Sequence, residues 1–244
     1  AQGMDFGLWV EPEMVNPDSD LYRAHPDWVY HFEHRHADEL RNQLVLNMTR
    51  DDVREYILGR LDELLEKHNI KYIKWDMNRS IANVYSNEDK YQGNVYYDYV
   101  LGLYDFLERL NKNYPDILIE GCSGGGGRFD AGMLYYTPQI WCSDNTDAID
   151  RTKIQYGTSF GYPVSAVGAH VSAVPNHQTG RSVSIDTRGV VAMSGSFGYE
   201  LDLGKVSEAE KNTIKEQIKT FKKEAELIYN GLYYRLSDPY KDPV

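Results

Sequence analysis

Apolar residues occur along the chain in two alternating patterns. Short apolar runs predict six strands, near residues 6–10, 70–77, 116–122, 139–143, 164–174 and 196–203. Between them, apolar residues recur at helical spacing, for example over 53–65, 95–110 and 214–228. Strands that alternate with helices in this way predict parallel βα units, and therefore an α/β fold.

Polar and small residues mark the expected ends of the helices. Thr49 is expected to cap a helix with two acids in its first turn, and Pro115 to follow the end of a second helix. Asp147 stands where it can cap a helix that begins directly after it. Ser207 and the glutamate three residues later form a capping-box pattern, and Gly231 is placed to end that last helix.

Five of the six strands run into polar residues at their carboxyl ends. The segments that follow read GLWVEPE, KWDMNR, EGCSGGGGR, WCSDNTD and PNHQTGR. In a closed parallel barrel all these ends meet at one mouth, whereas a doubly wound sheet binds ligands only at its switch point. Five polar ends therefore favour a TIM-type barrel.

Composition narrows the classes of function. The 244 residues include 26 basic and 37 acidic side chains, a net charge of −11, which makes nucleic acid or an anionic membrane a poor partner. No apolar run approaches the ~18 residues of a membrane span. Two cysteines, Cys122 and Cys142, make no disulfide framework, so reduced thiols and a cytoplasmic location are expected.

The segment KWDMNR places an acid, Asp76, between two cations. One interpretation is a structural ion-pair network in which Lys74 and Arg79 neutralise Asp76. The other is a nucleophilic carboxylate: in an extended strand Lys74, Asp76 and Asn78 share one side, and the lysine keeps the pKa of Asp76 low. On this interpretation Trp75 points the opposite way, into the packing between strands and helices.

A second acidic site lies in SDNTD. Asp147 has the capping role as a sufficient explanation, so Asp144, closer to the strand end, is the better catalytic candidate. Asp76 and Asp144 then make a carboxylate pair of the kind that glycoside hydrolysis requires, one ionised and one protonated. Trp9 and Trp141 offer apolar faces for a pyranose ring.

Two further motifs have competing interpretations. The glycine loop CSGGGG, residues 122–127, lacks the Lys-Ser/Thr of a P-loop and the spacing of a dinucleotide fingerprint, so we expect it to bring bare backbone close to a ligand. His34 and His36 raise the alternative of a metal-dependent barrel hydrolase, but the stretch is very polar and has no HExxH pattern. No metal and no cofactor are expected.

The motifs together resemble those of the α-galactosidases of glycoside hydrolase family 36. KWDMNR, CSGGGGRFDAGMLYY, WCSDNTDAIDRTKIQYGTS, VGAHVSAVPNHQTGR and GLWVEPEMVNPDSDLYRAHPDW carry the resemblance, which covers almost the whole chain. It implies a retaining hydrolase that removes terminal α-linked galactose from melibiose or raffinose by double displacement. Asp76 would be the nucleophile and Asp144 the acid/base, with their carboxyls ~5–5.5 Å apart. The galactose-binding residues implied by the resemblance are Trp9, Arg41, Lys74, Asn78, Cys122, Gly124 and Trp141.

The resemblance begins at what looks like the third strand of a (β/α)8 barrel. It implies an incomplete TIM barrel over residues 1–231, with 232–244 opening a linker to a C-terminal β domain. The first two strands and a pair of adjacent, sugar-binding aspartates fall outside it, and Gly121 and Cys142 replace an expected Ser and Thr. Six units leave two strand edges, so we expect association between copies or completion by another segment. An active enzyme and a non-catalytic, weakly sugar-binding fragment both remain open, and we expect little activity from the chain alone.

Overall fold

A computed structural model describes residues 3–86 and 90–242, and the chain divides into two compact units. Unit 1 comprises Ala1–Gly124 and Tyr135–Thr137. Unit 2 comprises Gly125–Leu134 and Pro138–Val244. In the described ranges no helix is long and apolar enough to cross a membrane.

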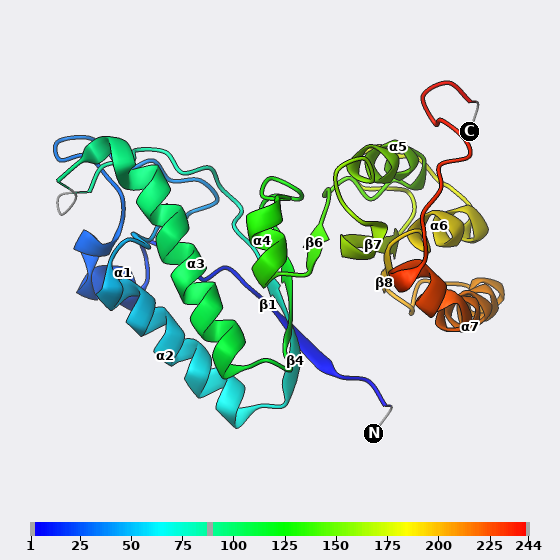
Figure 1. The fold of residues 1–244 in the computed structure, drawn as a ribbon, viewed down its shortest axis with the longest axis horizontal. Helices are drawn as coiled ribbons and strands as arrows, with labels where there is room; N and C mark the ends of the chain where they lie inside the picture. Colours follow the sequence, from blue (N-terminus) through cyan, green and yellow to red (C-terminus); the bar gives the residue numbers. More distant parts are fainter. Residues whose placement is uncertain (1–2, 87–89, 243–244) are drawn as a thin grey trace. The chain divides into compact units, whose positions relative to one another are not determined.

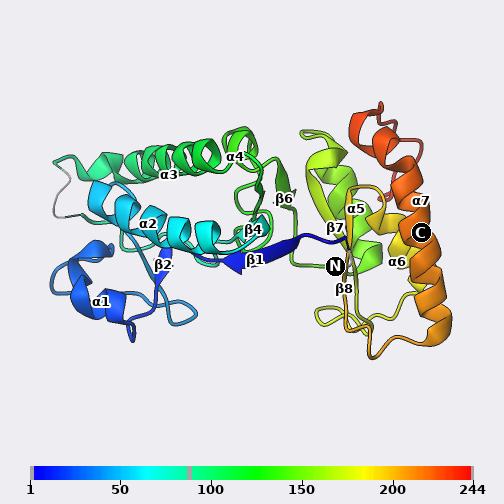
Figure 2. The same ribbon diagram turned by 90° about the horizontal axis from the view of Figure 1, so that it is seen from below.

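Unit 1 is built on three parallel strands, with β4 (Ile70–Trp75) between β1 (Phe6–Val10) and β5 (Leu118–Gly121). Two helices, α2 (Asp51–Lys67) and α3 (Val95–Asn113), lie side by side in both views (Figures 1 and 2). The fully buried ring of Trp75 meets Phe106 of α3 with ring centroids 5.4 Å apart. Trp75 therefore points into the packing, as the alternation of side chains predicts. The smaller elements of this half of the chain are β2 (Met14–Val15), α1 (Asp20–Ala24), η1 (Pro26–Trp28), β3 (Leu44–Val45) and η2 (Gln92–Asn94).

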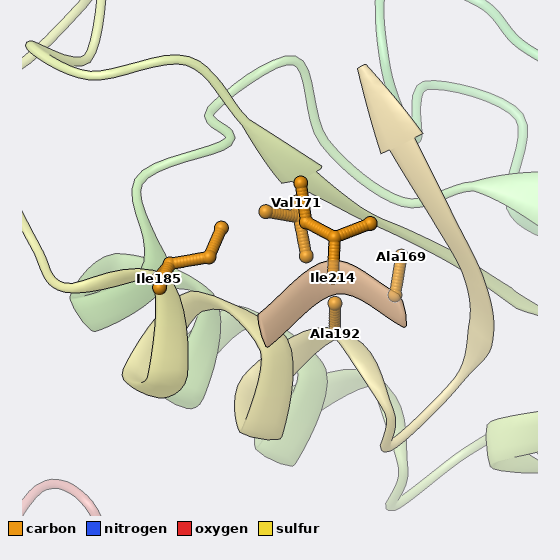
Figure 3. Packing of buried hydrophobic residues seen from close by; sticks show 5 residues of the cluster. All are labelled: Ala169, Val171, Ile185, Ala192 and Ile214. Atoms are coloured by element: carbon orange, nitrogen blue, oxygen red, sulfur yellow. The ribbon is translucent and has the colours of Figure 1, made fainter. Parts of the chain in front are cut away.

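Unit 2 repeats the arrangement with β7 (Val167–Ser172) between β6 (Gln139–Trp141) and β8 (Ser196–Glu200), all parallel. The helices and turns of this unit are α5 (Ala148–Thr158), η3 (Val164–Ala166), α6 (Ile185–Ala192) and α7 (Glu208–Asn230). Helix α4 (Ala131–Tyr136) is divided between the two units after Leu134. Its core cluster joins β7 to α6 and α7 (Figure 3), through Ala169, Val171, Ile185, Ala192 and Ile214. Residues far apart in sequence thus form one apolar centre.

All six predicted strands are confirmed, and five of the six are shorter than expected. The predicted strand 70–77 ends at Trp75, so Asp76 and Asn78 lie in the loop beyond it. The short antiparallel ribbon of β2 and β3 was not predicted, because two-residue strands leave no periodic signal.

Two of the three predicted N-caps are confirmed. The Ser207 capping box is present, and the Asp147 carboxylate caps α5. The expectation for Thr49 is wrong: α2 begins at Asp51 with Arg50 in the cap position, and the Thr49 hydroxyl donates to Asn47 instead. The two acids of the first turn remain to stabilise that helix end.

Gly102 of α3 makes a testable contact in unit 1. A Cβ at this position would lie 2.0 Å from the carbonyl oxygen of Met48, which also accepts a hydrogen bond from Arg54. We expect Gly102→Ala to lower the free energy of unfolding by about 1–3 kcal/mol. Gly59→Ala is the control: Gly59 is exposed on α2 with open space around it, and alanine there should stabilise by about 0.5–1 kcal/mol. Urea unfolding followed by tryptophan fluorescence measures both, and equal shifts would contradict the contact.

Candidate active site

The carboxylate of Asp76 lies just beyond β4 and is surrounded by hydrogen-bond donors. Its Oδ2 accepts from Trp9 Nε1 at 3.1 Å and from Asn78 Nδ2 at 2.7 Å, and its Oδ1 accepts from the backbone N–H of Met77 at 2.8 Å. The backbone N–H of Asp76 donates to the carbonyl of Val10 at 2.9 Å. The ends of β1 and β4 therefore bring Trp9 and Asp76 together.

These donors decide the charge of Asp76. Burial raises the pKa of this carboxyl, but hydrogen bonds from Trp9, the Cys122 thiol, Asn78 and the Met77 backbone outweigh burial and lower its pKa overall. A carboxylate that accepts several hydrogen bonds is stabilised in its charged form. Asp76 is thus an ionised carboxylate held by neutral donors.

Lys74 was expected to help keep Asp76 ionised, and its described partner is Glu120. Its Nζ lies 3.3 Å from Oε1 of Glu120, whose side chain is fully buried on β5. Burial is the largest influence on the pKa of Asp76, and the hydrogen bonds from Trp9, Cys122 and Asn78 are the first of those that lower it. A contribution of Lys74 to the charge of Asp76 stays a prediction.

Arg79 does not support the alternative in which Asp76 belongs to an ion-pair network. Its guanidinium donates to the backbone carbonyls of Asp38, Gln43 and Ser80. Burial lowers the pKa of Arg79, and the nearby Asp38 opposes that shift. Arg79 thus holds a loop in place through its carbonyls.

That loop carries Arg41. The backbone N–H groups of Leu40 and Gln43 each donate to the other's carbonyl, and the two residues between them have φ of 56° and 58°. Positive φ at both central residues is the type I′ two-residue turn. Arg41 stands at the tip of this turn, and its side chain is exposed.

Cys122 and Gly124 follow β5. The Cys122 N–H donates to the Trp75 carbonyl at 2.7 Å, and its own carbonyl accepts from Met77 at 3.2 Å. This pairing places the thiol beside the Asp76 carboxylate. Gly124 has φ +56°, and a Cβ at this position would meet no atom within 4 Å. Glycine is therefore favoured here by the left-handed backbone conformation and not by crowding.

The glycines that follow, in unit 2, pack against the chain itself. A Cβ on Gly125 would lie 2.9 Å from the backbone nitrogen of Asp144, and one on Gly126 would lie 2.5 Å from the carbonyl of Cys142. The sequence predicted that this loop brings bare backbone close to a ligand. In the structure, these two glycines bring it close to the segment that leads into Asp144. These two glycines help to set the path of that segment.

Asp144 lies beyond β6 with its side chain exposed. Its Oδ1 accepts from Trp141 Nε1 at 3.1 Å. The Trp141 ring is 3% exposed and lies 4.4 Å from the Arg151 guanidinium carbon and 4.7 Å, between centroids, from the His170 ring. Trp141 is therefore held rigidly and in turn fixes Asp144.

Asp147 is fully engaged in structure. Its carboxylate accepts from the backbone N–H groups of Ile149 and Asp150, each at 3.0 Å, and from the Thr179 hydroxyl at 2.9 Å. It also pairs with Arg181, and its side chain is 1% exposed. These contacts leave Asp144 as the available acid of SDNTD.

Trp9 differs from Trp141 in exposure. The Trp9 residue is 54% exposed although its Nε1 is bound to Asp76. An exposed indole beside a carboxylate can stack on the apolar face of a sugar ring. Of the two tryptophans named from the sequence, Trp9 has the accessible face in this structure.

Glu11 was missed by the sequence analysis. Its Oε1 accepts from Asn78 Nδ2 at 2.7 Å, and its Oε2 accepts from Gln43 Nε2 at 3.0 Å. The available signal was the polar ending GLWVEPE itself, because an acid directly after a barrel strand belongs to the same set of strand ends as Asp76.

The histidines of the metal alternative lie apart from this arrangement. His34 and His36 are both exposed. Among residues 3–86 and 90–242, no group of three or more His, Cys, Asp or Glu side chains is placed to hold a metal ion.

Known proteins match the chain over nearly its full length. The Melibiase family model matches residues 1–231. The chain is 63% identical over 243 residues to the bifunctional α-galactosidase/sucrose kinase AgaSK of Mediterraneibacter gnavus, covering all of this chain and 25% of that protein. It is 54% identical to the α-galactosidase AgaA of Geobacillus stearothermophilus, covering 98% of this chain and 33% of AgaA.

Solved structures show the same fold. A crystal structure of an AgaA variant in complex with raffinose matches with a TM-score of 0.96 at 53% identity, covering 98% of this chain and 34% of that one. The galactosidase domain of AgaSK matches with a TM-score of 0.94, covering 99% of this chain and 33% of that one. The chain thus spans about a quarter to a third of these relatives, and the α/β fold of an incomplete TIM-barrel type is confirmed. From these matches and the motifs at its strand ends, the chain belongs to the Melibiase family, among the family 36 α-galactosidases.

Proposed function

We propose that this chain supplies the catalytic acids of a retaining α-galactosidase, which removes terminal α-linked galactose from oligosaccharides of the melibiose and raffinose type. The observation that carries the proposal is the Asp76 carboxylate, kept ionised by neutral donors beside the exposed Trp9 ring. Structures of AgaA variants with raffinose and with stachyose support the substrate class.

The proposed reaction is a double displacement. Asp76 attacks the anomeric carbon while the C–O bond to the leaving group breaks, and Asp144 gives its proton to the departing oxygen. Asp144, now a carboxylate, takes a proton from water, and the resulting attack on the anomeric carbon frees galactose and restores Asp76. Chemistry of this kind needs one carboxyl ionised and the other protonated at the start.

Seven residues are proposed to bind the galactosyl unit. They are Trp9, Arg41, Lys74, Asn78, Cys122, Gly124 and Trp141. Asn78 and Cys122 already contact the Asp76 carboxylate, so each would bind sugar and nucleophile together.

A second candidate is a non-catalytic fragment that binds sugar weakly. The observation that favours it for the isolated chain is the exposed side chain of Asp144, which has a single described hydrogen-bond donor, Trp141.

One exchange experiment separates these candidates. We expect the 244-residue chain alone to hydrolyse 4-nitrophenyl α-galactoside little or not at all. Replacing the matched quarter of AgaSK by this chain should give an active chimera, because the other three quarters of AgaSK then surround the matched region. Asp76→Ala in the chimera should lower kcat by about 10⁴-fold or more, with azide restoring part of it as β-galactosyl azide. A chimera that folds but stays inactive would sink the proposed function.

The roles within SDNTD are tested by a matched pair in the same chimera. Asp144→Asn should slow substrates with poor leaving groups, such as raffinose, by about 10²–10⁴-fold and 4-nitrophenyl galactoside much less. Asp147→Asn should mainly lower the free energy of unfolding, by about 1–3 kcal/mol, because an amide cannot form the ion pair that the buried carboxylate makes with Arg181. A leaving-group dependence that appears only in Asp147→Asn would reverse the assignment.

The low pKa of Asp76 predicts a pH-dependent stability. A carboxyl whose folded pKa is depressed stabilises the fold above its unfolded pKa of about 3.9, and this contribution is lost as the pH falls through the folded pKa. Trp9→Phe removes one donor, so the pKa of Asp76 should rise and the unfolding free energy at pH 7 should fall by about 1 kcal/mol.

Carbon-13 titration of the carboxyl and urea unfolding at two pH values measure both effects. The difference between Trp9→Phe and the parent should shrink once the pH lies below the folded pKa. In an Asp76→Asn background, Trp9→Phe should show no pH-dependent difference. If Trp9→Phe lowers the unfolding free energy equally at both pH values in the chain that retains Asp76, Trp9 stabilises the fold by packing alone.

A further inference from the structure

We infer that Glu11 is a positioning residue for the reaction: it fixes the Asn78 amide against Asp76 and ties the Arg41 turn to the same point. This inference rests on the proposed function for its catalytic consequence. Its structural part stands on contacts within unit 1 alone.

The Asn78 amide nitrogen bridges two carboxylates. It donates to Oε1 of Glu11 and to Oδ2 of Asp76, both at 2.7 Å. A side-chain amide carries two N–H donors on its nitrogen, so these two acceptors use both. The opposite orientation would turn the amide oxygen toward two negatively charged oxygens. Glu11 therefore selects one orientation of the Asn78 side chain.

This orientation has a consequence for a bound sugar. Within the described residues, the amide oxygen of Asn78 accepts no hydrogen bond. With its nitrogen held by Glu11 and Asp76, Asn78 presents an acceptor for a hydroxyl of the galactosyl unit. Without Glu11, the Asn78 amide is held by Asp76 alone and rotates more freely. Its contact to the sugar and its contact to Asp76 are then both weakened.

The second oxygen of Glu11 connects to the Arg41 turn. Gln43 Nε2 donates to Glu11 Oε2 at 3.0 Å, and the backbone of Gln43 closes the type I′ turn and accepts from Arg79. One side chain thus joins the turn that carries Arg41 to the loop that carries Asp76. A shift of either loop changes the geometry of the other.

Glu11 also places a second negative charge near Asp76. The shared amide lies between the two carboxylates and donates to both, which offsets their repulsion. Both oxygens of Glu11 accept from neutral amides. The NH₂ group of a glutamine at this position would face the NH₂ of Gln43, unless the Gln43 amide turns over and presents its oxygen, which has no described partner.

Four variants test the inference. Glu11→Ala removes both contacts, and Glu11→Gln removes the charge and either loses the contact to Gln43 or requires the Gln43 amide to turn over. The double exchange Glu11→Gln with Gln43→Glu reverses the donor and acceptor between the two side chains and keeps the contact to Asn78. Glu33→Gln is the matched control, because Glu33 is exposed and makes no described contact.

The first readout is independent of activity. In the 244-residue chain, the side-chain amide of Asn78 is identified in the nitrogen–proton NMR spectrum by its loss in Asn78→Asp. We expect Glu11→Ala to accelerate hydrogen exchange of that amide by about tenfold, the equivalent of one lost charge-assisted hydrogen bond. Glu33→Gln should leave it unchanged. An unchanged amide in Glu11→Ala would overturn the inference.

The second readout uses the AgaSK chimera. Glu11→Ala should lower kcat/KM by about 10–100-fold, and the double exchange should recover part of what Glu11→Gln loses. A loosened amide with kinetics equal to those of Glu33→Gln would overturn the positioning role. An inactive parent chimera would refute the proposed function, whereas the amide readout would still decide whether Glu11 fixes Asn78.

Discussion

The hydrogen bonding of one carboxylate, Asp76, is the constraint on which unit 1 depends. Its donors come from the ends of three parallel strands: Trp9 from β1, Asn78 from the loop after β4 and Cys122 after β5. Only parallel strands in this order bring those positions together, because all three leave the sheet at the same edge. The parallel order of β1, β4 and β5 therefore positions the donors around Asp76 as well as the apolar core.

The two acids of SDNTD in unit 2 have different surroundings. Asp147 Oδ1 accepts from the N–H groups at the start of helix α5 and pairs with Arg181, and its Oδ2 accepts from Thr179. Asp144 has an exposed side chain and a single described donor, Trp141. Two acids of the same type therefore differ because one lies at a helix N-terminus and the other does not. Residue type alone carries none of this distinction.

Sequence periodicity predicted what depends on neighbours along the chain. The six strands, the cap at Asp147 and the capping box at Ser207 follow from local patterns. The pairing of Lys74 with Glu120 and the hub at Glu11 join strands that lie far apart in sequence. Such contacts are set by the register between strands, which no single segment encodes. Asp76 and Asp144 were candidates from their place at the strand ends, whereas Arg41, Cys122 and Gly124 came from motif resemblance alone. The roles of all these residues stay predictions.

The use of neutral donors around Asp76 has a mechanistic rationale. In the proposed reaction Asp76 would lose its charge as it bonds to the anomeric carbon, so an interaction that stabilises the free carboxylate more strongly than the transition state would raise the barrier. A lysine in direct contact would stabilise the free carboxylate most, because an ion pair in a partly buried site is strong. Indole, amide, thiol and backbone donors keep Asp76 ionised with individually weaker interactions. Lys74 lies 3.3 Å from the buried Glu120, so part of the charge of its ammonium is balanced within the sheet by that carboxylate.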